Sequence, residues 1–234
     1  MTKAYLEPNE VQKLEWAATN LRDRLLIRLI FRLGSRVSEA LALEVRNVDW
    51  EHRTVMIVHL KTRFRLLCPN CQAHLGRSHS FCPGCGTKIE GPLARQQSER
   101  KQRILPVDNE TLAMLAEYVE RGGPVVRDGK QLLFGINRHR AWQVVTACAQ
   151  RAGLEKLVNP ETGRLHNVSP HRLRDAFAVH AMKQDDSGDA QRLLQQHLGH
   201  ASFNTTARYR KVAGEEQRKW YDRLWKKPED SGSN

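Results

Sequence analysis

Apolar residues return at helical spacing near the start of the chain. Between residues 21 and 33, leucine and isoleucine recur every three or four positions, and arginines, Arg28 among them, lie off the apolar stripe. This pattern predicts an amphipathic helix that ends at Gly34. A second helix is expected to follow at once, capped by Ser35, and a shorter helix is expected to begin near Pro8, whose fixed φ suits a first turn.

One small sheet is expected among the helices. The β-branched run Thr54–Leu60 predicts a strand, and Arg103–Val107 is its expected partner in a hairpin. The connection from Lys61 to Gln102 is far longer than the two to five residues usual for a hairpin loop. It must therefore contain something folded or something disordered.

Helical spacing continues over the rest of the chain. Two further helices are predicted around Leu112–Val119 and Ala141–Ala152, and another begins at Ser169-Pro170. After it, a short helix is predicted to end near Leu198-Gly199, followed by one around Thr205–Val212 and one over Glu215–Trp225. After Pro170, a step of 100° per residue puts His171, Arg174 and Asp175 on the side of the helix opposite Leu173. The predicted fold class is mainly α with a small antiparallel β-sheet (α+β).

Four cysteines lie inside the long connection. Cys68 and Cys71 form one C-x₂-C knuckle, and Cys82 and Cys85 form a second one ten residues later. Two such knuckles can deliver four thiolates to one tetrahedral Zn²⁺, and four thiolates leave no open position for catalysis. We expect a zinc-ribbon-like insertion with a structural metal. The alternatives are two disulfides, a thiol redox pair, or a ligand role for His74 or His79.

The net charge of the chain indicates what kind of partner it binds. Lysine and arginine number 38 against 26 aspartates and glutamates, a net charge of +12. Such an excess favours a polyanion, because clustered cations release counterions from phosphate backbones. Nucleic acid is the first expectation, and ribosome or heparin binding fits the charge as well. No membrane span or secretory signal is predicted, so a cytoplasmic location is expected.

Three sequence blocks together point to a known family. They are G-S-R-V-S-E-A-L-A-L (Gly34 to Leu43), H-R-L-R-D-A-F-A (His171 to Ala178) and L-G-H-A-S-F-N-T-T-A-R-Y (Leu198 to Tyr209). Their order, with histidine and tyrosine nine positions apart in the last block, resembles the catalytic domain of tyrosine recombinases, the phage integrase family. The resemblance covers about Leu6 to Val212, apart from the cysteine insert. It implies site-specific DNA breakage and rejoining through a 3′-phosphotyrosyl intermediate, with no cofactor for catalysis, and it suggests a mobile genetic element.

The resemblance also implies the site residues. The family's catalytic residues fall on Arg36, His171, Arg174, His200 and the nucleophile Tyr209. Its hairpin lysine falls on Lys61, with Lys101 as the alternative because the insert interrupts the hairpin. Asp175 stands where the family more often has histidine, and an acceptor there is expected to orient a neighbour.

Organisation and partners follow from the same resemblance. Residues 1–61 and 101–213 are the expected catalytic domain, residues 62–100 the zinc-binding insertion, and residues 214–234 a C-terminal helix and tail, which the family commonly exchanges between subunits. The expected partners are double-stranded DNA, a homo-oligomer (a tetramer on paired sites) and accessory proteins. The family's N-terminal DNA-clamping domain is not in this sequence, which favours a fragment over a minimal recombinase.

Other interpretations of the same residues stay open. Basic residues in and near the insert, including Lys88 and Arg103, form a candidate extra DNA grip, against a structural staple or a protein-docking role. A type IB topoisomerase would use similar chemistry on one strand. A zinc-containing DNA-binding regulator with a vestigial site is the rival outside enzymes. Taken singly, His171 and Arg174 would also fit a solvated helix face.

Overall fold

The computed structural model describes residues 3–58, 64–76, 78–90, 93–96, 102–159, 162–185 and 187–199. Its helices are α1 (Pro8–Trp16), α2 (Leu21–Arg32), α3 (Val37–Leu41), the 3₁₀ turn η1 (Val45–Asn47), α4 (Asn109–Glu120), α5 (Arg138–Arg151), α6 (Pro170–Gln184) and α7 (Gly188–Leu198). Its strands are β1 (Val48–Asp49), β2 (Thr54–Val58), β3 (Phe64–Leu67), β4 (His74–Leu75), β5 (Leu93–Gln96), β6 (Gln102–Pro106), β7 (Val125–Arg127), β8 (Lys130–Leu132), β9 (Leu157–Val158) and β10 (Leu165–His166). The predicted fold class, mainly helical with small antiparallel sheets, is confirmed.

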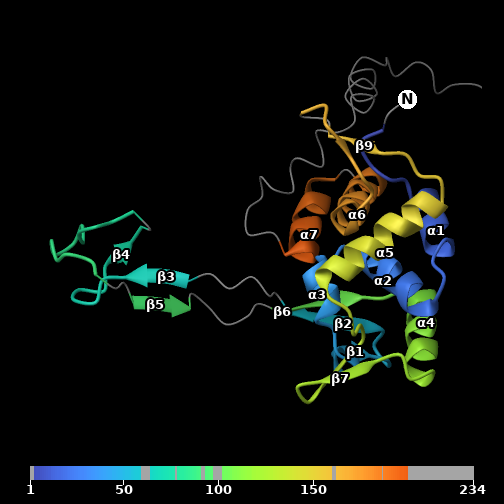
Figure 1. Ribbon diagram of the computed structural model, residues 1–234, viewed down its shortest axis with the longest axis horizontal. Coiled ribbons are helices and arrows are strands. Elements are labelled where there is room, and N and C mark those ends of the chain that lie inside the picture. Colours follow the sequence, from blue (N-terminus) through green and yellow to red (C-terminus); the bar gives the residue numbers. More distant parts are fainter. Residues whose placement is uncertain are drawn as a thin grey trace, which may run out of the picture.

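Helix α2 is the central element of the helical body (Figure 1). It packs against α1, α4, α5 and α6, and Leu25, Ile27 and Ile30 are fully buried. A helix that is apolar on most sides needs neighbours on most sides. Even Arg28, which the sequence places off the apolar stripe, is buried: it donates to Glu15 Oε2 at 3.0 Å and to Thr111 Oγ1 at 2.9 Å. Arg28 therefore ties α2 to α1 and α4.

The turn between α2 and α3 lies directly on α6. Helix α2 ends as predicted, with Gly34 at φ +54°, and a Cβ on Gly34 would lie 2.4 Å from Phe177 Cδ1. The expected cap is wrong, because Arg36 and not Ser35 is the N-cap of α3. The Ser35 hydroxyl is buried without a hydrogen-bond partner in the described part of the chain. Glycine is required here both for the backbone angle and for the close approach.

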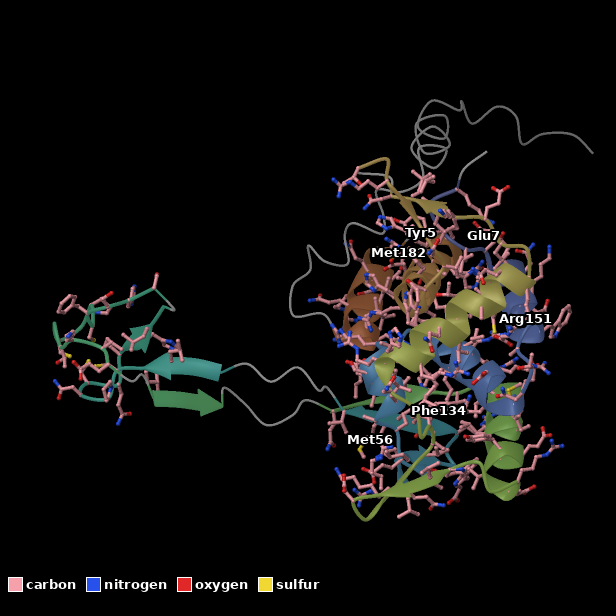
Figure 2. All side chains as sticks on the ribbon, viewed as in Figure 1. Tyr5, Glu7, Met56, Phe134, Arg151 and Met182 are labelled. Carbon is pink, nitrogen blue, oxygen red and sulfur yellow. The ribbon has the colours of Figure 1, made fainter. Side chains whose placement is uncertain are left out.

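The predicted hairpin forms between β2 and β6. The two strands are antiparallel, from Thr54 opposite Pro106 to Val58 opposite Gln102, and β1 extends the sheet on the other edge of β2. Side chains alternate along β2: Val55 and Ile57 are buried, while the intervening residues are only partly buried. Figure 2 shows Met56 at this sheet and Phe134 inside the helical body.

The cysteine insert continues this hairpin. Strands β3 and β5 pair from Phe64 opposite Gln96 to Leu67 opposite Leu93, and β4 joins the other edge of β3. Residues 59–63 and 97–101 are equally long, so the β3–β5 ladder has the same register as the β2–β6 ladder. Figure 1 shows β3, β4 and β5 apart from the helical body. The insert is an elaboration at the tip of the β2–β6 hairpin.

Helices α6 and α7 complete the described structure. Helix α6 begins at Pro170 and α7 ends at Leu198, both as predicted. Ser169 is the N-cap residue of α6, although its side chain makes no capping hydrogen bond, and Gly199 adopts the left-handed conformation with φ +65°. The two helices share a small apolar cluster that includes Val179 and Leu194. The short hairpins β7–β8 and β9–β10 are not anticipated by the sequence. No described helix combines the length and apolar character needed to cross a bilayer. The helices expected over Thr205–Val212 and Glu215–Trp225 lie outside the described residues.

Candidate active site

Arg36 is held at the start of α3 by a carboxylate on the same helix. Glu39 Oε2 accepts from the backbone N–H of Arg36 at 3.0 Å, and Glu39 Oε1 accepts from Arg36 Nη1 at 2.8 Å. The Glu39 side chain is only 1% exposed, whereas that of Arg36 is 34% exposed. Glu39 thus holds both the backbone N–H and the guanidinium of Arg36 at the start of the helix.

A second guanidinium, from the hairpin, binds the same carboxylate. Arg103 in β6 donates from Nη2 to Glu39 Oε2 at 2.7 Å and from Nη1 to Oε1 at 3.4 Å. Burial alone would raise the pKa of Glu39, but the hydrogen bonds and positive charges of Arg103 and then Arg36 lower that pKa to about 2. Glu39 is therefore ionised at every pH at which the protein is handled.

Arg174 joins the three sequence blocks. Its side chain is 3% exposed, with Nη1 donating to the carbonyl oxygen of Gly34 at 2.6 Å and Nη2 to that of Leu198 at 2.9 Å. Arg174 Nη1 also lies 4.0 Å from Glu39 Oε2. The solvated-face interpretation is wrong for Arg174. The carbonyls two residues before Arg36 and two residues before His200 are both bonded to this one guanidinium.

His171 stands on the first turn of α6, near a buried acceptor. Its side chain is 63% exposed, and its Nε2 lies 3.8 Å from Asp175 Oδ2. Asp175 is 4% exposed and accepts from Arg172 Nη1 at 3.0 Å. Asp175 thus lies where the sequence expects an orienting acceptor.

A further histidine, which sequence reasoning missed, lies between the arginines and the core. His197, in the last turn of α7, donates from Nε2 to the carbonyl oxygen of Leu33 at 3.1 Å, and its ring stacks on Phe177 with centroids 4.8 Å apart. Burial lowers the pKa of His197, and the positive charges of Arg103 and Arg174 lower it further. The ring is neutral at neutral pH and anchors α7 to the end of α2.

Several predicted site residues cannot be placed from the described ranges. Lys61, its alternative Lys101, His200 and Tyr209 lie outside the described residues. The residue before His200 is described: a Cβ on Gly199 would lie 2.8 Å from Arg103 Nη1. The Leu198-Gly199 end of α7 therefore packs directly on the arginine cluster.

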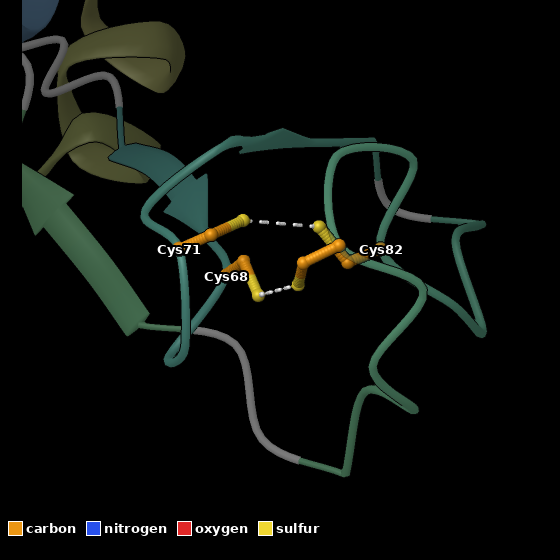
Figure 3. Close-up of side chains that lie close together, drawn as sticks. Cys68, Cys71 and Cys82 are labelled. Atoms are coloured by element: carbon orange, nitrogen blue, oxygen red, sulfur yellow. Dashed lines mark hydrogen bonds between the residues drawn. The ribbon is translucent and has the colours of Figure 1, made fainter.

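The four insert cysteines come together as predicted. Their Sγ atoms all lie within 4.8 Å of one another, with Cys71 and Cys82 3.5 Å apart and Cys68 and Cys85 3.7 Å apart (Figure 3). All four are free thiols, which sets aside the disulfide alternative. Zn–S bonds of about 2.3 Å in a tetrahedron give sulfur–sulfur edges of about 3.8 Å. The donor set and its spacing fit a Zn²⁺ ion.

Glu39 and Arg103 are the site residues that the sequence analysis missed. Glu39 is three positions after Arg36, the spacing at which an acidic side chain reaches back to a helix N-cap. Arg103 gave a weaker signal, because its charge placed it with the basic residues of the insert. The structure instead puts its side chain, 12% exposed, against Glu39. Of that basic group, Lys88 is exposed and pairs with Glu90 at 3.4 Å.

Comparison with known proteins agrees with this geometry. The phage integrase family matches residues 4–76 and 87–216, leaving out only ten residues of the insert between the matched segments. The chain belongs to the phage integrase family.

Curated and solved members give the extent of the likeness. The tyrosine recombinase XerD of Mycobacterium leprae (strain TN) is 29% identical over 201 residues, covering 81% of this chain and 48% of XerD. XerA of Pyrococcus horikoshii is 26% identical over 216 residues, 88% of this chain and 56% of XerA. The chain thus spans about half the length of the curated relatives it matches.

Solved structures share the fold. A crystal structure of XerA recombinase has a TM-score of 0.62 at 21% identity, over 97% of this chain and 67% of that chain. The catalytic domain of bacteriophage HP1 integrase has a TM-score of 0.53 at 18% identity, over 94% of both chains. The described helices and sheet are therefore those of an integrase catalytic domain.

This integrase-family site has the electrostatics of a phosphate receptor. Arg36, Arg103 and Arg174 surround one ionised carboxylate, so the four side chains together carry a charge of +2. Guanidinium groups bind phosphate oxygens in a planar, bidentate way and stay charged in every environment.

Proposed function

We propose that this chain is a site-specific DNA recombinase that breaks and rejoins strands through a 3′-phosphotyrosyl bond to Tyr209. The observation that carries the proposal is the Arg174 junction. One buried guanidinium bonds the carbonyl two residues before Arg36 and the carbonyl two residues before His200. Three blocks far apart in the sequence thus converge on one cationic point, as transfer of a single phosphoryl group requires.

The arginines act on the phosphate. Arg36 and Arg174 bind the non-bridging oxygens of the scissile phosphate, and His200 adds a donor where negative charge develops in the transition state. Preorganised donors cost no reorganisation when the reaction occurs, and Glu39 supplies this for Arg36. Two guanidinium charges meet the need for positive charge at this phosphate.

Proton transfer occurs at the Tyr209 hydroxyl oxygen and at the departing 5′ oxygen. The Tyr209 oxygen forms a bond to phosphorus as the bond from phosphorus to the 5′ oxygen breaks, so one phosphodiester replaces another. A tyrosine hydroxyl has an ordinary pKa of about 10 and needs a base. His171, with Asp175 3.8 Å from its ring nitrogen, accepts that proton. Lys61 donates a proton to the departing 5′ oxygen.

The partners follow from the chemistry and from the relatives. The partner is double-stranded DNA, and the homo-oligomer is a tetramer on paired sites. XerH has been solved bound to a difH substrate, and lambda integrase as a dimer bound to a core site. We assign residues 1–61 and 101–213 to the catalytic domain, residues 62–100 to the insertion, and residues 214–234 to a helix and tail exchanged between subunits.

The insertion holds a structural Zn²⁺. Cys68, Cys71, Cys82 and Cys85 supply four thiolates at the right spacing, and the insert has few other apolar residues to hold it folded. Because β3 and β5 keep the register of the β2–β6 hairpin, we place the metal cross-link on the insert side of that hairpin. The ion stiffens the hairpin and takes no part in phosphoryl transfer.

Covalent capture tests the proposed function. A pool of nicked duplexes with a randomised core is incubated with the wild-type chain, and DNA that stays attached in detergent is sequenced. We expect an adduct with wild type and with Tyr5→Phe, and none with Tyr209→Phe, which should still bind the captured duplex. An adduct with Tyr209→Phe would remove the nucleophile. Relaxation of supercoiled plasmid by a monomer would indicate a topoisomerase instead.

A further inference from the structure

Arg103 occupies the point where the insert returns to the catalytic body. It is the second residue of β6 and pairs with Ile57 at the insert-proximal end of the β2–β6 ladder. Its guanidinium lies between the Glu39 carboxylate on α3 and Gly199 at the end of α7. One side chain of the hairpin thus touches the segments that carry Arg36 and His200.

We propose that Arg103 is a positioning residue for the strand-breaking reaction, an inference that rests on the function proposed above. Its guanidinium neutralises Glu39, so that Glu39 can hold Arg36 in place without opposing the charge of Arg36 and Arg174 at the scissile phosphate.

The charge balance of the cluster supports this role. Glu39 is almost fully buried, it bonds Arg36, and it lies 4.0 Å from Arg174 Nη1. A buried carboxylate beside guanidiniums that bind a phosphate would weaken their attraction for it, since charges interact strongly where water is excluded. With Arg103 the four side chains carry +2, and without Arg103 they carry +1. Arg103 therefore compensates the negative charge of Glu39, which would otherwise cancel one of the two positive charges of Arg36 and Arg174.

The geometry indicates that Arg103 acts through Glu39. Both of its terminal nitrogens are directed at the two carboxylate oxygens, the fork arrangement that is specific to arginine. Its Nε is buried with no hydrogen-bond partner among the described residues. A lysine at this position would keep the charge and lose the fork, so the two contributions can be separated.

Single-turnover cleavage of the captured duplex measures the effect. We expect Arg103→Met to slow cleavage about 100-fold, because removal of one preorganised charge typically costs that much. Arg103→Lys should have a cleavage rate between those of wild type and Arg103→Met, about 10-fold slower than wild type. Arg121→Met is the matched control: Arg121 is exposed, pairs with Glu117 on α4, and should leave the rate within about twofold of wild type.

A double variant separates positioning from a general structural loss. If Arg103 acts by neutralising Glu39, then Glu39→Gln added to Arg103→Met removes the charge that Arg103 no longer balances. The double variant should be no slower than Arg103→Met alone, although Glu39→Gln slows the wild type. Rate losses that multiply would show that the two residues act independently and would overturn the proposal.

The salt dependence of binding separates positioning from a direct DNA contact. Each phosphate contact contributes close to one unit to the slope of log affinity against log salt concentration. Arg103→Met should leave this slope unchanged, and a slope lower by about one would overturn the proposal.

Controls keep the outcomes distinct. Thermal unfolding shows whether each variant is folded, and if Arg103→Met is not, Arg103→Lys and its double variant with Glu39→Gln carry the test. No adduct with wild type would refute the proposed function itself. An adduct formed equally fast by wild type and by a folded Arg103→Met would refute this inference alone.

Discussion

At the scale of single residues, the site depends on backbone atoms as much as on charged groups. Arg174 uses two carbonyl oxygens, and one of them belongs to Gly34, whose backbone angle and contact with Phe177 exclude any side chain. The position of the Gly34 carbonyl, and hence of Arg174, follows from a residue that has no functional group. Glu39 likewise performs no chemistry of its own but sets the direction of Arg36.

Substitution of Gly34 tests this dependence. Gly34→Ala should lower the free energy of unfolding by about 2 to 4 kcal/mol, because it adds a clash with Phe177 to the strain of a positive φ. The measurement is chemical denaturation. Gly153→Ala is the matched control, since Gly153 has φ +65° and open space around its Cβ, and it should cost only about 1 kcal/mol. Equal losses in the two variants would contradict the packing role of Gly34.

At the scale of elements, the β2–β6 hairpin is the link between the insert and the site. Arg103 lies at its insert-proximal end, and the β3–β5 pairs of the insert have the same register as the β2–β6 pairs. Among the insert side chains that the structure describes, the apolar cluster consists of Cys68, Leu75 and Cys82 with three partly buried neighbours. Burial of so small a cluster cannot offset the conformational entropy lost when the insert is ordered. A cross-link must supply the remaining folding free energy.

Removal of one thiolate tests the metal. Wild type purified without chelators should contain one Zn²⁺ per chain, and Cys82→Ser should contain much less. In Cys82→Ser the NMR resonances of the insert should collapse to unfolded positions, while the thermal unfolding of the helical body stays within a few degrees, since the two have separate apolar clusters. Cys148→Ser, which changes the buried cysteine of α5, is the control and should keep its metal. Wild type without zinc would contradict the site.

At the scale of the whole molecule, charge governs the encounter with the substrate. A net charge of +12 remains after every acidic side chain has been counted, and the arginine cluster is one concentrated part of the positive charge. A long polyanion is attracted to such a surface before any specific contact forms.

From this charge we expect salt to control DNA binding. The affinity for a duplex of about 30 base pairs should fall linearly in log–log coordinates as salt rises, with a slope of about −4 or steeper, because several phosphates exchange their counterions for protein cations. Fluorescence anisotropy between about 50 and 200 mM salt measures the slope. A flat dependence would contradict backbone-dominated binding.

The local rules of the chain predict much of this fold. Helical spacing and the caps Gly34, Pro170 and Gly199 locate their helices correctly, and β-branching locates β2. Ser35 shows the limit of these rules, because the Glu39 side chain takes over the start of α3 and leaves Arg36 as the cap. The two short hairpins lack a strong β pattern and depend on tertiary packing.

The candidate site is predictable where residue type reveals chemistry. The four cysteines are fixed by spacing, and Arg36, His171 and Arg174 by motif. Glu39 and Arg103 are 64 residues apart, and nothing in the sequence pairs a helix carboxylate with a hairpin arginine across an insertion. That pairing follows only from the tertiary fold, in which α3 packs against β2 and the neighbouring strand β6 carries Arg103.

The two carbonyl bonds of Arg174 also bear on how a copy of this protein would decay. In a chain that no longer needed to cut DNA, loss of this guanidinium would still break the two hydrogen bonds that join α7 to the α2–α3 turn. Purifying selection for a folded chain alone would retain the arginine. Inactive descendants should therefore keep Arg174 long after the nucleophile has drifted away.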